Sequence, residues 1–343
     1  MVVPRYKPAI GGLEKHVEKV CKGLLGKDHK LTILTSSHSH DLLAEECIDD
    51  ISIIRIPYEI DRNPILSYLW ILRNRRKFTD FDVVHVHDPL PLLLWYFPLL
   101  VLRKQMPVYA TFHGFERDPV PVIFRIIRKI ARKLVKRVLC IGRFIENTYD
   151  VQCDAVSIGA VESVPPSTGK RTGIVFVGRL EEDTGILEYM QALVLLKEKH
   201  KISIPLTICG SGSLSSSLET FVQENGLDVH LKGLVDNPVS IMSSSTIALA
   251  AGYLSILEAM AAGLPVIAIA KSSLKFDYYR QVIVEGGPIS IQTTPEGIAR
   301  EIVRLERNKE LSNTISNRGL TFAQQMTWTR VINCYLKLWK SSE

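Results

Sequence analysis

The sequence predicts an α/β fold in which two parallel, doubly wound domains follow one another, and three observations lead to this prediction. The chain has 343 residues, which is long enough for two domains of ordinary size. Apolar runs typical of strands alternate with helical patterns, as in a doubly wound sheet. The run VIAIA at 266–270 lacks polar alternation, which is typical of a strand buried on both faces of a parallel sheet.

The N-terminal half is expected to open on the last residues of a strand and then to alternate between strands and helices. We expect strands at 1–3, 31–35, 51–56, 83–87, 108–112 and 137–141. We expect helices at 13–25, 64–78, 90–103, 120–136 and near 143–150. Proline, serine and threonine cluster in VESVPPSTGKRTG, which predicts a linker near 159–171. We therefore expect domains at 1–160 and 161–325, followed by an amphipathic helix at 326–343.

Composition narrows the class of protein. Hydrophobic residues make up 46% of the chain and charged residues 23%, which is globular, and no apolar run reaches the ~20 residues needed to span a bilayer. The net charge of +6 suits an anionic ligand or an anionic membrane surface. No aromatic interleaving accompanies the basic residues, so nucleic acid is not an expected partner. No secretory signal is recognisable before the opening MVVPRY, so we expect a cytoplasmic protein whose first strand begins upstream.

The cysteines are scattered and form no CxxC pair. We therefore expect buried free thiols in a reducing cytoplasm and no metal ligation by them. The six are Cys21, Cys47, Cys140, Cys153, Cys209 and Cys334.

The stretch 243–271 predicts a ligand site. Its pattern is a strand at 246–249, a helix at 255–262 ended by Gly263, and the strand 266–270. Glu258 is the acidic residue within this block, in the first turn or so of a helix that opens at a strand end, where ligands bind in open α/β sheets. Helix N-terminal amides can hold phosphate, and a carboxylate accepts hydrogen bonds from ribose hydroxyls. A capping glutamate on a packed βαβ unit explains the same residues equally well.

The segment LSILEAMAAGLPVIA resembles the nucleotide-sugar site of family 4 retaining glycosyltransferases. The resemblance implies the GT-B fold, with two Rossmann-like domains facing across a cleft and a terminal helix crossing back to the first. It also implies a nucleotide-sugar as co-substrate, with no cofactor and no metal. The family usually carries Glu, seven residues, then Glu. The second glutamate matches Glu258, but the first falls on Ala250, which implies a lost contact to the donor sugar.

A second family pattern follows the expected strand 174–177, where GRL places an arginine that can bind a diphosphate bidentately. The usual form continues with three residues and Lys-Gly, but Thr184 replaces that lysine, so one cation is lost. From the residues alone, Arg179 could also be a surface arginine. By resemblance, the loops PAIGGLEKHV, GSG and KGLV also approach the donor. The implied donor-binding residues are Gly11, Gly12, Arg179, Gly212, Leu234, Ser255, Ile256, Leu257 and Glu258.

The acceptor side is expected at ATFHGFE. His113 follows a strand, where a neutral imidazole can orient or deprotonate a hydroxyl or contact the donor, although a structural strand-end histidine is the alternative. The resemblance places His113 in the active site with Arg179 and Glu258, while the donor phosphate itself can serve as the base. Glu116 and Asp118 are candidate acceptor contacts, or solvated loop acids. DFDVVHVHDP is not expected to bind metal, because residues two apart on a strand merely share a face. His85 and His87 are instead expected to be hydrogen-bonded at a strand end.

The segment PVPVIFRIIRKIARKLVKRVLC holds seven basic residues and no acids. A basic amphipathic helix at 121–136 can bind an anionic membrane, with the apolar segment 90–102 as its neighbour. We expect Arg128, Lys129, Arg132 and Lys133 to form the charged surface. A domain helix that packs its apolar stripe on the sheet and solvates its charges fits equally well.

Three functions follow from these patterns. The first is a retaining glycosyltransferase that moves a sugar from a nucleotide-sugar to a lipid-linked or glycan acceptor, at the inner membrane face if the basic helix binds lipid. The second is a non-catalytic nucleotide-binding relative or partner subunit, suggested by Ala250 and Thr184. A nucleotide-sugar epimerase on the same fold is a third, against which the GRL pattern argues.

Overall fold

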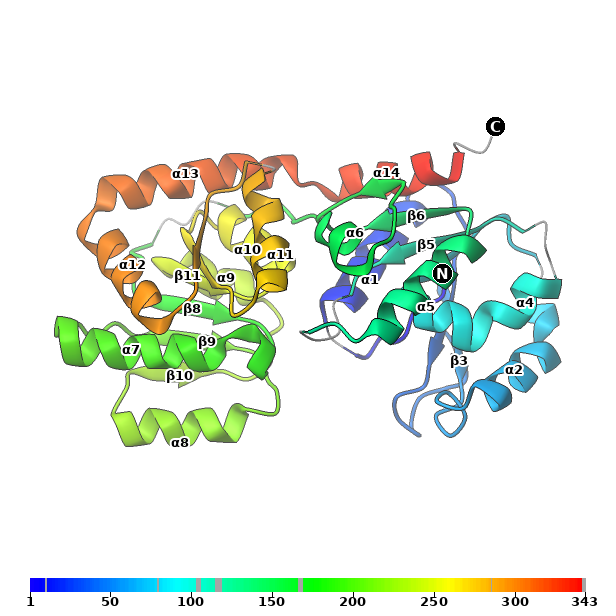
Figure 1. Cartoon of the computed structure of the whole chain (residues 1–343), viewed down its shortest axis with the longest axis horizontal. Helices are drawn as coiled ribbons and strands as arrows, with labels where there is room; N and C mark the ends of the chain where they lie inside the picture. The colour runs from blue at the N-terminus through cyan, green and yellow to red at the C-terminus, as the bar shows by residue number, and fades with distance from the viewer. Residues whose placement is uncertain are drawn as a thin grey trace. The chain divides into compact units, whose positions relative to one another are not determined.

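The computed structural model describes residues 1–9, 11–78, 80–102, 106–114, 119–165, 169–284 and 286–340. The chain divides into two compact units. Unit 1 comprises Met1–Ile158 and Trp328–Glu343, and unit 2 comprises Gly159–Thr327. Each unit is a sheet of largely parallel strands with helices packed on it (Figure 1). None of the helices within the described ranges is long and apolar enough to cross a membrane.

The sheet of unit 1 has two parts that a single residue joins. Its strands are β1 (Thr32–Ser36), β2 (Glu45–Ile48), β3 (Ile51–Ile56), β4 (Val84–His87), β5 (Val108–Phe112), β6 (Arg137–Cys140) and β7 (Ala155–Val156). Their orders are β1-β3-β2 and β4-β5-β6-β7. The strand expected at 1–3 is only a bridge, in which Val2 pairs with Leu34 of β1 and Val86 of β4. Val2 therefore makes the two parts continuous.

Strand β2 was not predicted, and it runs antiparallel to β3. Asp49 and Asp50 connect the two strands with φ of 52° and 61°. Positive φ at both central residues is the geometry of a tight hairpin turn, which aspartate tolerates better than most residues. The first sheet is therefore mixed at its β2 edge rather than wholly parallel.

The helices of unit 1 differ from expectation mainly in the apolar segment after β4. They are α1 (Gly12–Leu25), α2 (Pro64–Arg73), the 3₁₀ turn η1 (Arg75–Phe78), α3 (Pro89–Pro91), the π turn η2 (Leu92–Tyr96), α4 (Phe97–Leu102), α5 (Val122–Leu134), α6 (Phe144–Tyr149) and α14 (Trp328–Lys340). The single helix expected at 90–103 is thus three short pieces. Pro98 lacks the backbone N–H that a regular helix needs at that position, which explains the π turn before it.

Unit 2 contains one parallel sheet of six strands in the order β10-β9-β8-β11-β12-β13. The strands are β8 (Ile174–Val177), β9 (Leu206–Cys209), β10 (Val229–Leu231), β11 (Ile247–Ala250), β12 (Val266–Ile269) and β13 (Ile289–Gln292). The helices are η3 (Glu182–Thr184, a 3₁₀ turn), α7 (Ile186–His200), α8 (Ser215–Asn225), α9 (Pro238–Ser243), α10 (Tyr253–Ala261), α11 (Ser273–Val284), α12 (Pro295–Arg307) and α13 (Lys309–Gln325). Helix α7 contacts α8 and α12, whereas α10 contacts α9 and α13 (Figure 1). The strands are buried between these two helical layers, which explains runs such as VIAIA.

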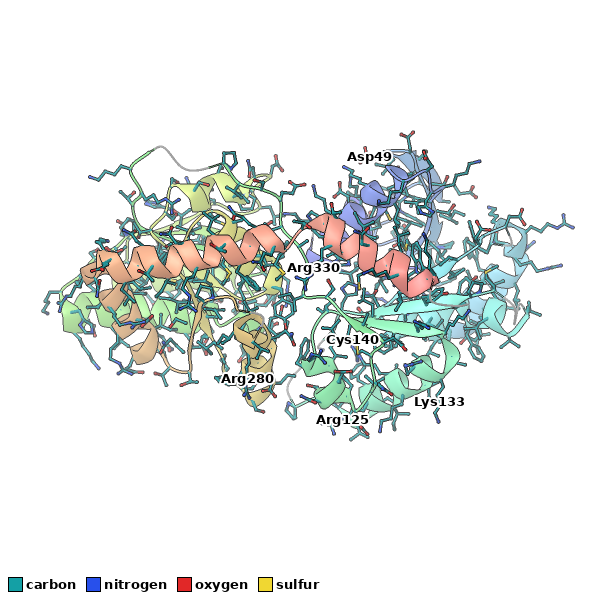
Figure 2. The ribbon with its side chains drawn as sticks, turned by 90° about the horizontal axis from the view of Figure 1, so that it is seen from above. Asp49, Arg125, Lys133, Cys140, Arg280 and Arg330 are labelled. Carbon is teal, nitrogen blue, oxygen red and sulfur yellow. A yellow bond between two sulfur atoms is a disulfide. The ribbon has the colours of Figure 1, made fainter. Side chains whose placement is uncertain are left out.

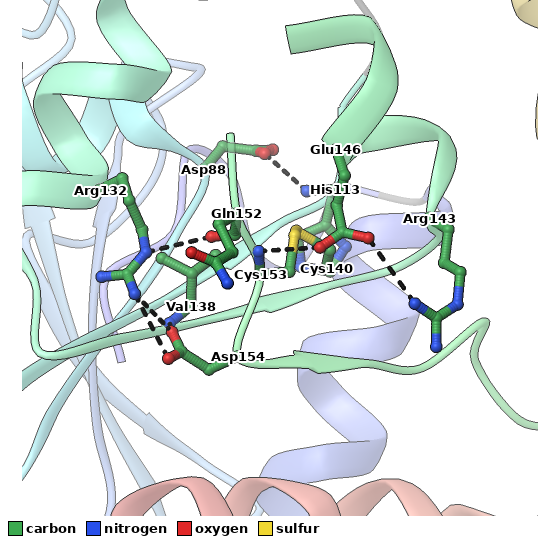
Figure 3. The surroundings of a disulfide bond; sticks show 10 residues. All are labelled: Asp88, His113, Arg132, Val138, Cys140, Arg143, Glu146, Gln152, Cys153 and Asp154. Carbon is green, nitrogen blue, oxygen red and sulfur yellow. Dashed lines mark hydrogen bonds and ion pairs between the residues drawn. A yellow bond between two sulfur atoms is a disulfide. The ribbon is translucent and has the colours of Figure 1, made fainter. Parts of the chain in front are cut away.

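The expectation of six free, buried thiols is wrong for four of the cysteines. Of these, Cys334 is free but only partly buried. Cys140 and Cys153 form a disulfide with a Cα–Cα distance of 6.0 Å (Figure 3), and Cys47 is exposed. Parallel pairing of β7 with β6 sets Val156 opposite Cys140, so the segment leading into β7 returns beside the end of β6. That register brings two cysteines together that are 13 residues apart.

Helix α5 does not present its cations as expected. Arg128 is fully buried, with its guanidinium carbon 3.8 Å from the ring centre of Tyr149, and Arg132 bonds Gln152 and Asp154. The apolar side chains of the helix are not all packed on the sheet either, because Ile126 and Ile130 are nearly half exposed. Both expectations for this helix therefore need correction, since its buried face carries an arginine and its outer face carries isoleucines.

Candidate functional site

The candidate donor residues of unit 2 follow the carboxyl ends of its strands. The chain leaves β8 in one direction through β9 to β10, and it returns on the other side of β8 through β11 and β12 to β13. The order reverses between β8 and β11, and open α/β sheets bind ligands beyond the carboxyl ends of the strands at such a point. Arg179 follows β8, Gly212 follows β9, Leu234 follows β10, and Ser255 and Glu258 follow β11.

Two glycines let the loops after β8 and β9 press together. A Cβ atom on Gly210 would come within 1.8 Å of the carbonyl oxygen of Gly178, and φ of Gly210 is 153°. A Cβ atom on Gly212 would come within 2.3 Å of the carbonyl oxygen of Leu180. Leu180 N also donates to Ser211 O over 3.0 Å. Gly212 therefore has a packing role that holds the arginine loop in place.

The loop 178–184 carries Arg179 in an ion pair. Its Nη2 lies 2.8 Å from Oδ2 of Asp183, and the side chain is 67% exposed. Glu181 accepts hydrogen bonds from the backbone N and Oγ of Ser213, which lowers the pKa of its carboxyl group. Thr184, which stands where the related lysine is usual, is buried and donates its hydroxyl to the carbonyl of Glu181 over 2.7 Å. Thr184 thus holds the loop together rather than facing a ligand.

Helix α10 begins at Tyr253, two residues before the expected start. Tyr253 N donates to the hydroxyl of Tyr278 over 2.9 Å, and the two rings stack with their centres 4.0 Å apart. The amides of Leu254 and Ser255 precede the first intrahelical bond, from Ile256 N to Gly252 O. Amides in this position are the ones a helix offers to an anion.

Because α10 starts earlier than expected, the remaining candidates Ile256, Leu257 and Glu258 lie further along the helix than the sequence predicted. Ile256 and Leu257 are fully buried core residues. Glu258 is 5% exposed and lies in the second turn rather than the first. A carboxylate in that position cannot cap the helix, which removes one alternative for Glu258.

Two polar residues at this edge were missed from the sequence. Tyr189 of α7 is fully buried, and its hydroxyl donates to Ala250 O over 2.9 Å while accepting from Ile269 N over 3.0 Å. Lys275 of α11 is 7% exposed and donates to Ala251 O over 2.9 Å. Both bind backbone next to the position of the lost glutamate, Ala250. In the sequence, the one indication of Tyr189 and Lys275 was that each places a polar group on an otherwise apolar face of its helix.

The carboxyl edge of the unit 1 sheet holds His113, directly after β5. Its Nε2 lies 2.9 Å from Nδ1 of His87, and its backbone N donates to Oδ1 of Asp88 over 2.8 Å. Burial lowers the pKa of His113 to about 3, so the ring is neutral at physiological pH. Asp88 has φ of 66°, a strained conformation for this residue that is typical of functional sites. Sequence reasoning named His113 and His87 but not Asp88.

His85 is fixed by a chain of hydrogen bonds that includes the terminal helix. Trp339 of α14 donates Nε1–H to Nδ1 of His85 over 3.1 Å. Because burial keeps His85 neutral, its remaining proton is on Nε2, which contacts Oγ1 of Thr111 at 2.7 Å. Thr111 contacts the hydroxyl of Tyr335 at 3.0 Å. His85 and His87 are thus hydrogen-bonded as expected, although the partners from α14 were not foreseen.

The glycine loop before α1 leaves space beside Gly12, whereas a Cβ atom on Gly11 would come within 2.3 Å of Oε2 of Glu14. Gly11 precedes α1 and Gly12 is its first residue, and a Cβ atom on Gly12 would meet no heavy atom within 4 Å. One turn later, His16 contacts the hydroxyl of Tyr335 through Nε2 at 2.9 Å, and its ring centre lies 5.0 Å from that of His113. Sequence reasoning missed His16. The acceptor candidates Glu116 and Asp118 lie outside the described residues.

Comparison with protein families matches nearly the whole chain. The family model "Glycosyltransferase Family 4" matches residues 10–151, and "Glycosyl transferases group 1" matches residues 162–321. An uncharacterised glycosyltransferase of Methanocaldococcus jannaschii is 24% identical over 95% of this chain and 93% of its own length. A phosphatidyl-myo-inositol mannosyltransferase of Mycolicibacterium smegmatis is 24% identical over 96% of this chain and 90% of its own.

Solved structures show the same fold. The Anabaena protein HepE, in complex with UDP and glucose, superimposes with a TM-score of 0.78 at 12% identity and covers 100% of this chain and 99% of its own. Sucrose-phosphate synthase of Thermosynechococcus elongatus superimposes with a TM-score of 0.75 at 16% identity, covering 99% and 98%. The expected GT-B fold is confirmed.

Proposed function

This chain belongs to the family 4-type glycosyltransferases of the GT-B fold, and we propose that it transfers a sugar, with retention, from a nucleotide-sugar to a lipid-linked or glycan acceptor. The observation that carries the proposal is the switch-point edge of unit 2. At this edge, the loop with Arg179 follows β8, and the N-terminal amides of α10 and the buried carboxylate of Glu258 follow the neighbouring strand β11. Support for the donor class comes from HepE, whose structures hold UDP, glucose and UDP-glucose.

Each unit 2 group has a chemical task in this proposal. Arg179 binds the diphosphate of the donor, and the α10 amides add hydrogen bonds to it. Glu258 accepts hydrogen bonds from ribose hydroxyls. Leu234, 64% exposed after Gly233, lies beside the base. The first sugar contact of the family pattern is absent at Ala250, so the donor sugar must be held by other groups.

His113 of unit 1 is proposed to act by hydrogen bonding rather than as a general base. A group whose conjugate acid has a pKa of about 3 is a poor proton acceptor near neutral pH. The ring is neutral and is oriented by His87 and Asp88, so it can hold a hydroxyl in place. Proton removal from the acceptor is then assigned to the departing phosphate of the donor, which requires no cofactor.

The stereochemical outcome tests the proposed function most directly. Wild-type protein would be screened by thermal shift against nucleoside diphosphates and their sugar conjugates, and the conjugate that stabilises it would be used with lipid and glycan acceptors. Proton NMR of the product should show the anomeric configuration of the donor. An inverted product would contradict retention, and binding without turnover of any acceptor would favour the non-catalytic alternative.

Glu258→Gln is expected to leave the fold intact and to weaken nucleoside diphosphate binding. The amide keeps the size of the side chain but loses its negative charge, so hydrogen bonds from ribose hydroxyls become weaker. Losing a hydrogen bond to a charged group should cost roughly 1.5–3 kcal/mol in binding, measured by calorimetry. The 2′,3′-dideoxy ligand serves as control and should bind both proteins alike. Equal affinity of wild type and variant for the ribose ligand would remove Glu258 from the site.

The outer face of unit 1 is consistent with a lipid acceptor. Helix α5 exposes apolar side chains that alternate with basic ones. Helix α3 contacts α5, and α2 contacts α4 (Figure 1). Arg125 and Lys133 lie on the outer side of α5 (Figure 2). The exposed apolar residues on these helices are Ile65, Leu66, Leu69, Leu90, Val101, Leu102, Val122, Ile123, Ile126 and Ile130. We propose that this face binds anionic membrane, as the lipid substrate named for the mycobacterial relative also suggests.

Vesicle binding tests the membrane proposal. Wild-type protein should sediment with phosphatidylcholine vesicles only when phosphatidylglycerol is included, and less as salt rises, because the Debye length is about 3 Å at 1 M. The triple variant Arg125→Gln, Lys129→Gln, Lys133→Gln should bind roughly 30- to 100-fold more weakly, at ~1 kcal/mol for each of Arg125 and Lys133 and less for Lys129, which is paired with Asp150. The control Lys27→Gln, Lys30→Gln, Lys199→Gln removes three exposed cations elsewhere and should bind as wild type. If the wild type does not sediment with phosphatidylglycerol vesicles at low salt, the membrane proposal is wrong and a soluble glycan becomes the expected acceptor.

A further inference from the structure

Lys275 is a buried lysine at the ligand edge of the unit 2 sheet. Its side chain is 7% exposed, although it lies in the first turn of α11, just beyond the end of β12. Its Nζ donates to the carbonyl of Ala251 over 2.9 Å, and the hydroxyl of Tyr279 donates to the same oxygen over 3.2 Å. Ala251 is the residue that follows β11 at the switch point. The hydrogen bond therefore holds the ammonium beside the loop that leads into α10.

The arginine loop needs a further cation if it is to hold a diphosphate. Residues 179–184 carry one base, Arg179, and three acids, Glu181, Glu182 and Asp183. Arg179 is already paired with Asp183 at 2.8 Å. Thr184 supplies a hydroxyl where a lysine is usual, and that hydroxyl is bonded to Glu181 O. A diphosphate placed here would meet a loop whose own net charge is negative.

The ammonium of Lys275 belongs to the same electrostatic cluster. Burial lowers the pKa of Lys275 to about 8, the carboxylate of Asp183 opposes that shift, and the guanidinium of Arg179 adds to it. Lys275 on α11 therefore interacts electrostatically with Arg179 and Asp183 of the loop after β8, which are themselves paired. The ring centres of Tyr278 and Tyr279 lie 5.1 and 5.3 Å from Nζ, which stabilises a cation there.

We propose that Lys275 is the second cation of the donor diphosphate site and takes the place of the lysine absent at position 184. This assignment rests on the proposed function, because it presumes that a nucleotide-sugar binds at this edge. Arg179 approaches the diphosphate from the β8 loop, and Lys275 approaches it from α11. The cation lost from one loop is thereby restored from a different element of the fold.

Calorimetry with four ligands tests the assignment: UDP, GDP, UMP and GMP at pH 7. Lys275→Met keeps most of the apolar stem and should weaken binding of the preferred diphosphate ~10- to 100-fold, the scale of a hydrogen bond to a charged group. The monophosphate should lose much less. Arg280→Met removes an exposed cation from the same helix (Figure 2) and should bind both ligands as wild type. Lys275→Arg should keep the preference for the diphosphate.

Proton uptake gives a readout that does not depend on the variants folding. Because the pKa of Lys275 is lowered to about 8, part of the population is neutral at pH 8 in the free protein, and a bound diphosphate raises that pKa. Wild-type protein should therefore take up a fraction of a proton on binding, seen as a dependence of binding enthalpy on buffer. Lys275→Met and Lys275→Arg should take up none. Affinity of the wild type should fall as pH rises from 7 to 9.

The outcomes separate this assignment from the proposed function. If the wild type binds none of the nucleoside diphosphates in the thermal-shift screen, both are overturned. If the wild type binds one of them, but without proton uptake at pH 8 and with no loss in Lys275→Met, the proposed function stands and the assignment of Lys275 is wrong.

Discussion

Arg128→Met is expected to destabilise unit 1 by about 3–5 kcal/mol, the cost of removing one partner from a buried charged pair. Arg128 is fully buried against the rings of Tyr149 and Phe112, and its charge acts on Asp88. Without it, the carboxylate of Asp88 loses the nearby positive charge and keeps only hydrogen bonds from backbone amides, such as that of His113. Urea unfolding followed by circular dichroism measures the loss.

The pH dependence of the loss identifies its cause. Burial already raises the pKa of Asp88, and Arg128 opposes this shift, so the variant should raise that pKa further. A raised carboxyl pKa in the folded state lowers stability as pH rises, since the folded state binds the extra proton. The variant should thus recover part of its stability on going from pH 7 to pH 5, relative to wild type. Lys133→Met, an exposed control on the same helix, should change stability by less than about 0.5 kcal/mol. A loss that does not change with pH would exclude Asp88 as its source.

Arg179→Ala is expected to weaken nucleoside diphosphate binding by roughly 2–3 kcal/mol, the scale of hydrogen bonds between charged groups. The loss should grow from nucleoside to monophosphate to diphosphate, because the guanidinium contacts phosphate and not the base. The side chain is 67% exposed, so the substitution should not affect folding. Calorimetric titration of the three ligands measures the gradient, and equal losses for nucleoside and diphosphate would show that Arg179 does not touch phosphate.

Asp183→Asn is the complementary test, because Asp183 is the residue that pairs with Arg179. The amide keeps the shape of the side chain but removes the ion pair at 2.8 Å that holds the guanidinium in the free protein. Diphosphate binding should therefore tighten, by up to ~1 kcal/mol, the usual value of an exposed pair. Weaker binding of Asp183→Asn would mean that the ion pair positions Arg179 for the ligand instead of competing with it.

The parts of the fold that could be predicted from sequence are those governed by local pattern. The run VIAIA predicted β12 to within one residue because a strand buried on both faces has no polar side. Strand β2, with the sequence EECI, escaped prediction because it is a half-exposed edge strand whose pairing depends on β3. The disulfide escaped for a related reason, since only the register of β7 against β6 brings Cys153 to Cys140.

The candidate site was predictable only where a residue type already carries its chemistry. An arginine after a glycine at a strand end indicates phosphate binding, and Arg179 lies where that pattern predicts. Arg128 looked like one more surface cation because its partners are Asp88 after β4, Phe112 of β5 and Tyr149 of α6, which are far apart in sequence. Lys275 escaped for the same reason, since the carbonyl that it binds is 24 residues away.

The hydrogen bonds from α14 to His85 and Thr111 also constrain the order of events during synthesis. Unit 2 is one continuous segment, Gly159–Thr327, whereas unit 1 is completed by residues from Trp328 onward. On the ribosome, the sheet of unit 1 emerges first, yet Tyr335 and Trp339 reach it only after all of unit 2 has been translated. Until unit 2 has been translated, His85 and Thr111 of the nascent N-terminal half therefore lack the hydrogen-bond partners that α14 supplies.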